Sequence, residues 1–146
     1  MDFELFLLSE RDKSELLNLL QHLCDILLKK QINNPNINKM KRKAQWLYNE
    51  LIQLSIEDND DDVNFINTQY HSNYNVCINI HVFHKCFDES IMFMFNIISV
   101  LCAYSKFKQF LLMSESGKII LLVVNGIIKC YEHEDYKYPF DIITNS

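Results

Sequence analysis

The dipeptide Asn125-Gly126 constrains the fold of this chain more than any other feature. It separates two apolar runs, 118–124 and 127–133. A type I′ hairpin turn needs positive φ at both central residues, which Asn and Gly tolerate. The other glycine, Gly117, stands in a Ser-Glu-Ser-Gly segment just before these runs. Because both of the chain's glycines stand where turns are needed, we predict an antiparallel meander of strands at 109–113, 118–124 and 127–133.

A further strand and a buried helix are expected before the meander. Apolar residues stand at every second position from Val76 to Val82, as in a strand with one buried face. Asp88 suits the start of a helix. The following segment, 91–103, is apolar nearly all round, which is typical of a helix buried in a core. The run 63–70 is expected to be one more strand, joined to the strand at Val76 by a turn.

The N-terminal third has the spacing of two helices. Ser9 is a good N-cap, and leucines recur on one face from there to about residue 30. A second helix is predicted from Asn38 to Ile56, because apolar residues from Met40 onward also keep a helical period. A polar turn around Pro35 would join the two helices into a helical hairpin.

These elements predict a single α+β domain over residues 1–146. Its parts are a helical part (1–56), an acidic loop (57–62), a sheet with a central helix (63–134) and a tail (135–146). The β-β-α-β-β-β order expected for residues 63–133 resembles the profilin-like sheet of roadblock and longin domains. The resemblance is one of topology, so it implies a layered sheet and carries no functional residue.

Composition narrows the function classes. The net charge of -5 and the pI of about 5.5 speak against broad binding to nucleic acid or to an anionic membrane. Acidic residues stand near the N-terminus, where a signal peptide would be basic, and the five cysteines are widely spaced. We therefore expect an intracellular protein, cytoplasmic or nuclear, with reduced thiols and no membrane partner. Abundant Ile, Asn and Lys beside two Gly and two Pro indicate an AT-rich genome of a virus, a parasite or a low-GC bacterium.

Metal, cofactor and catalytic sites are weakly supported. Cys77, His81, His84 and Cys86 are metal-ligating types, but a strand would carry His81 and His84 on opposite faces. The acidic loop lacks the spacing of an EF-hand, and phosphate-binding loops need clustered glycines that this chain lacks. The Cys-His neighbours at 22–24 and 130–133 show no orienting context. We expect no cofactor, no metal and no catalytic residue.

A basic cluster marks the expected start of the second helix. It comprises Lys39, Lys41, Arg42 and Lys43, followed by Trp46. Basic residues beside an aromatic ring are typical of nucleic-acid surfaces. Basic charge is also unfavourable at a helix N-terminus, so a partner or the acidic loop is expected to compensate it.

The sequence therefore favours a non-enzymatic protein-interaction or adaptor domain. Its partner would be another protein or a second copy of the chain, with interface residues in the aromatic tail. These residues are Tyr131, Tyr136, Tyr138 and Phe140. One alternative is a nucleic-acid-associated factor that uses the basic cluster. Another is an all-α viral regulator of its host, if the C-terminal strands are wrong.

Overall fold

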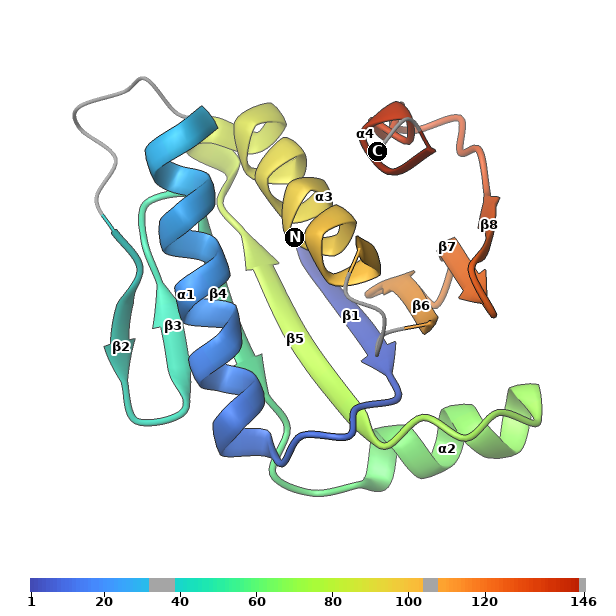
Figure 1. Cartoon of the computed structure of the whole chain (residues 1–146). Coiled ribbons are helices and arrows are strands. Elements are labelled where there is room, and N and C mark those ends of the chain that lie inside the picture. Colours follow the sequence, from blue (N-terminus) through green and yellow to red (C-terminus); the bar gives the residue numbers. More distant parts are fainter. Residues whose placement is uncertain (32–38, 104–107, 145–146) are drawn as a thin grey trace.

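The chain folds into an α+β structure with strands in a single antiparallel sheet (Figure 1). The computed structural model describes residues 1–31, 39–103 and 108–144. Within these ranges there are eight strands and four α-helices. Their bounds in chain order are β1 (Asp2–Leu7), α1 (Lys13–Gln31), β2 (Lys41–Lys43), β3 (Trp46–Tyr48), β4 (Ile52–Ile56), α2 (Asp61–Tyr70), β5 (Val76–Val82), the 3₁₀ turn η1 (His84–Cys86), α3 (Phe87–Ala103), β6 (Gln109–Ser114), β7 (Ile119–Val124), β8 (Ile127–Cys130) and α4 (Asp141–Thr144).

The first strand of the chain lies in the middle of the sheet. The strand order is β2-β3-β4-β5-β1-β6-β7-β8, so β1 pairs with β5 on one side and with β6 on the other. Alternation along β1 separates the two faces of the sheet. Phe3, Leu5 and Leu7 belong to the main hydrophobic core, whereas Phe6 belongs to a smaller cluster on the other face.

Two long helices cover one face of the sheet. Helices α1 and α3 lie side by side on it, and α4 packs against α3 (Figure 1). The segment His84–Ala103, which contains α3, is long and apolar enough to cross a membrane. In this fold Ile91, Phe95 and Ile98 of α3 are fully buried, as expected of a helix in the core of a folded domain.

The described residues cover the other face of the sheet at one end only. There α2 packs Val63 and Ile66 onto Phe6 and Cys77. Beyond α2, the face of β3, β4, β5 and the start of β1 carries polar and aromatic side chains. This open face is the region described below.

The predicted meander is confirmed. Strands β6, β7 and β8 pair in sequence, and Asn125 and Gly126 have φ of 51° and 79° in the turn between β7 and β8. The strand at Val76–Val82 is also observed, as is the buried helix that follows it.

The predicted helical hairpin is wrong in its second half. Helix α1 is observed, but residues 41–56 form the strands β2, β3 and β4. The turn between β2 and β3 uses Ala44 at a φ of 55°, a conformation that the sequence does not signal with glycine. Asn49 Oδ1 accepts hydrogen bonds from the backbone N–H groups of Leu51 and Ile52 (2.9 and 3.0 Å), which stabilises the next turn.

The predicted strand at 63–70 is also wrong, because these residues belong to α2. Acidic residues in the first turn suit a helix N-terminus. The buried Val63 and Ile66 are three residues apart, as on one face of a helix. The order from 61 onward is α2-β5-α3-β6-β7-β8, so the β-β-α-β-β-β layout behind the profilin-like resemblance is absent. The alternative of an all-α protein is likewise excluded by the sheet.

Candidate functional site

Two cross-strand rows of side chains make up the open face. In antiparallel pairs, directly opposite residues point to the same face. One row therefore crosses five strands through Lys43, Trp46, Ser55, Asn79 and Glu4. The second row lies beside it and runs through Lys41, Tyr48, Gln53, His81 and Asp2. Each row thus passes from a lysine on the edge strand, through an aromatic ring, to a carboxylate on the central strand.

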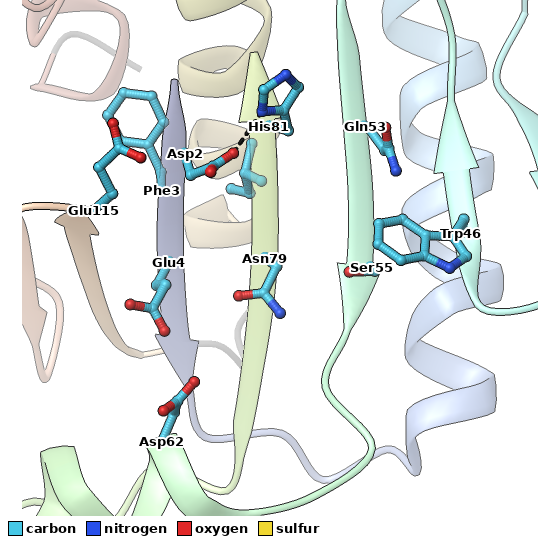
Figure 2. Close-up of a pocket in the computed structure, with 11 residues that line it drawn as sticks. Asp2, Phe3, Glu4, Trp46, Gln53, Ser55, Asp62, Asn79, His81 and Glu115 are labelled. Carbon is cyan, nitrogen blue, oxygen red and sulfur yellow. Dashed lines mark hydrogen bonds and ion pairs between the residues drawn. The ribbon is translucent and has the colours of Figure 1, made fainter.

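The face is hollowed between the aromatic and the acidic ends of these rows. The hollow has a volume of about 640 Å³. Figure 2 shows Trp46 on one side of it, Asp2 and Glu4 on the other, and Ser55 and Asn79 between them. Trp46 and Glu4 are three strand spacings apart, which is about 14 Å at ~4.8 Å per spacing.

The acidic wall draws carboxylates from three parts of the chain. Asp2 and Glu4 lie on β1, Asp62 lies in the first turn of α2, and Glu115 lies in the turn after β6. Glu115 is positioned by its backbone N–H, which donates to the carbonyl of Asp2 at 3.0 Å. Because α2 and the 114–117 turn both border β1, the fold gathers negative charge that is dispersed in the sequence.

Glu57 provides a further carboxyl group next to the acidic wall. Its Oε1 accepts a hydrogen bond from Asn79 Nδ2 at 3.1 Å, and its Oε2 is buried. Burial raises the pKa of Glu57 to about 7, and the neighbouring carboxyl groups of Asp62 and Glu4 add to this shift. Burial also raises the pKa of Glu4, again with a contribution from Asp62.

One group of side chains on this face has the spacing of a cation site. The ligand atoms of Glu4, Glu57 and Cys77 lie within 4.8 Å of one another. However, burial raises the pKa of the Cys77 thiol, as do the carboxylates around it, and its Sγ lies 3.7 Å from Glu4 Oε2 as a donor. Zinc binds the thiolate, so a zinc ion at this trio would have to displace the proton of Cys77.

The sequence-level metal candidates do not converge. His81 Nδ1 lies 2.5 Å from Asp2 Oδ1 at the edge of the hollow. His84 is exposed and stacks on Phe87 at 5.8 Å between ring centroids. Cys77 lies two rows away from His81 along β5, beneath α2.

The basic cluster is divided between the two faces of the sheet. Lys41 and Lys43 lie on the open face beside the aromatic rings of β3, and Trp46 is 45% exposed. Arg42 lies on the other face and donates a hydrogen bond to Asn18 of α1. Lys39 is exposed just before β2. The expected conflict with a helix N-terminus does not arise, because this segment is a strand.

The aromatic tail packs within the chain. Tyr138 is only 6% exposed and stacks on Phe95, with 5.9 Å between ring centroids. Tyr136 donates a hydrogen bond to Asp88 Oδ1 at 2.8 Å, and Phe140 also packs on Phe95. Tyr131 is half-buried, and its backbone N–H donates to the carbonyl of Ile120. Tyr138 is therefore buried within the chain, while Tyr131, Tyr136 and Phe140 stay partly exposed, and an interface in the tail stays a prediction.

The acidic wall was missed by sequence reasoning, although part of its signal is visible. Asp2 and Glu4 alternate with Phe3 and Leu5, which is the pattern of a strand with one polar face. Asp62 was visible only as part of the acidic loop 57–62, and Glu115 only as part of a turn. Neither pattern shows that the folded chain brings them to β1.

Comparisons with known proteins add no assignment. No family model matches the chain, and neither the curated proteins nor the solved structures give a match.

Proposed function

We propose that this chain is a non-enzymatic protein-interaction domain that binds its partner on the open face of the sheet. The observation that carries the proposal is the hollow beside Trp46. An indole that is 45% exposed stands next to a cavity of about 640 Å³ lined by polar groups. Interfaces are enriched in such aromatic residues and surround them with a polar rim.

The opposite face is already occupied. Helices α1 and α3 bury the core residues of the sheet there, and the tail fills the space beside α3. Met92, which is 51% exposed on α3, provides a contrasting apolar side chain away from the open face. The concave polar surface available to a partner is therefore on the open face.

The thiols support a binding role over a catalytic one. Burial raises the pKa of Cys24, Cys77 and Cys102, so these groups are protonated thiols near neutral pH. Beside Cys24, His22 is exposed while the thiol is fully buried. His133 lies 2.9 Å from the carbonyl oxygen of Ile119 through its Nε2. These placements give Cys24, Cys77 and Cys102 a packing role.

Capture from native extract tests the proposal. Tagged wild-type chain, Trp46→Glu and Met92→Glu are compared, with captured proteins identified by mass spectrometry. We expect at least one partner that Met92→Glu retains and Trp46→Glu loses, because only the first variant leaves the open face intact. Equal retention by both variants would contradict the proposal. Recovery of the chain's own copy would identify a homodimer as the occupant.

A second candidate function is nucleic-acid association through Lys41 and Lys43. The observation in its favour is that both lysines share the open face with Trp46 and Tyr48. The carboxylates across the hollow would repel phosphate, which is why we rank it second. Lys41→Glu with Lys43→Glu should abolish retention on single-stranded oligonucleotides if this function holds, and unchanged retention would dismiss it.

A further inference from the structure

The open face carries charge of one sign on its central strand. Asp62 and Glu115 are exposed, and Glu4 is half-exposed. The structure records ion pairs of Lys13 with Asp60 and of His81 with Asp2. No lysine or arginine of the described residues forms an ion pair with Glu4, Asp62 or Glu115. Glu4, Asp62 and Glu115 therefore face the hollow without a lysine or arginine counter-charge from the described part of the chain, whereas Asp2 is paired with His81.

The rest of the hollow suits a peptide backbone. Its middle is formed by side chains with donors and acceptors: Gln53 and Asn79, both half-buried, and the buried Ser55. The opposite wall is the exposed indole of Trp46. Amide and hydroxyl groups can satisfy the main-chain groups of an extended segment, while the indole covers an apolar or cationic side chain.

We propose that the occupant of the hollow is an extended segment of a partner protein that carries lysine or arginine. This rests on the proposed function and names its partner class. Its basic side chains lie against the acidic wall, where Asp62 is beside Glu4 and Glu115 is beside Asp2 (Figure 2). The segment continues across the sheet to Trp46. The distance of about 14 Å between the two walls corresponds to roughly four extended residues at ~3.3 Å each.

Charge complementarity favours this occupant over the others. A nucleic acid would bring phosphates to the carboxylates. A second copy would have to present its own basic edge, Lys41 and Lys43, to the acidic wall of its neighbour. Four carboxyl groups line the hollow. They attract a basic segment at long range and also orient it, because the opposite edge of the face is basic.

Peptide selection on the full-length chain tests the inference. A random dodecapeptide display library is selected on the immobilised protein, and enriched peptides are measured by fluorescence anisotropy. We expect enriched sequences with at least two Lys or Arg residues, and binding that weakens as salt is raised. The charge-neutral double variant Asp62→Asn with Glu115→Gln should bind about fivefold or more weakly. Asp62→Lys with Glu115→Lys should abolish binding.

A matched control removes two charges elsewhere. Glu89 on α3 and Glu134 in the tail are exposed and lie outside the hollow. Glu89→Gln with Glu134→Gln should leave peptide affinity within about twofold of wild type, because distant surface charges are screened. A loss as large as in the Asp62/Glu115 variant would overturn the inference, since net charge alone would then explain binding.

The outcomes separate this inference from the proposed function. Enriched peptides that are neutral or acidic but lose binding in Trp46→Glu would overturn the basic partner and leave the open face as the binding site. Peptides insensitive to both Trp46→Glu and the Asp62/Glu115 variants would overturn both. A library that yields no binder dependent on this face would count against both as well.

Discussion

Glu57 links the chemistry of the open face to the stability of the fold. Its Oε2 is buried, and the carboxyl groups of Asp62 and Glu4 are close neighbours. A proton on this carboxyl removes a buried charge and its repulsion from the other two. Because burial and these neighbours raise the pKa of Glu57 to about 7, the proton is bound more tightly in the folded state than in the unfolded chain.

Because the folded state binds the Glu57 proton more tightly, the stability of the fold depends on pH. The stabilisation of the folded state by the proton on Glu57 is fully present below pH 4.5 and is lost as the pH rises through about 7. Glu57→Gln keeps an acceptor for Asn79 and removes the ionisation. We expect it to raise the free energy of unfolding at pH 8 relative to wild type by on the order of 1 kcal/mol, reduced for solvent screening, with little change at pH 4.5.

Urea unfolding at both pH values measures this difference. Glu89→Gln serves as the control, because Glu89 is exposed on α3. A Glu57→Gln variant as pH-dependent as the wild type would show that the carboxyl is ionised in the fold at neutral pH.

At the scale of the elements, the residues in the turns explain which hairpins could be predicted from the sequence and which could not. The β7–β8 hairpin was predictable because Asn125 and Gly126 are residues that adopt positive φ readily. The β2–β3 hairpin also has a two-residue turn, but there only Ala44 has a positive φ, of 55°. Without that signal, the apolar spacing from Met40 to Leu54 fits a helix as well as three short strands. Helix α2 was missed for a related reason, since only two of its residues are buried and its periodicity is weak.

Exchanging the residue types at these two turns tests this explanation. Ala44→Gly should stabilise the protein by about 0.5 kcal/mol, because glycine relieves the left-handed strain at some cost in chain entropy. Gly126→Ala should destabilise it by about 1 kcal/mol, because φ is 79° there. Chemical unfolding of both variants measures the two changes. A destabilising Ala44→Gly would contradict the left-handed turn and favour the helix that the spacing suggests.

At the scale of the whole molecule, long-range pairing produces the open face. The N-terminal strand β1 lies between β5 and β6, and this places Asp2 and Glu4 opposite His81 and Asn79. Local sequence patterns predicted the α+β fold class, the meander of β6, β7 and β8, and the buried helix α3. They could not predict this placement, because the partners of β1 lie some 70 and 110 residues away in sequence. The acidic wall is therefore a property of the topology. The local pattern shows Asp2 and Glu4 on one polar face, but only the folded chain brings Asp62 and Glu115 to them.

Hydroxyl-radical footprinting of the chain with its captured partner tests the central claim most directly. Trp46 is the sole tryptophan and is exposed on the open face, while Met92 is exposed on α3. Both side chains react readily in the free protein, so each serves as the control for the other. We predict that partner binding strongly reduces oxidation of Trp46 and leaves Met92 unchanged. Protection of Met92 with Trp46 still fully reactive would contradict the claim that the open face of the sheet is the binding site.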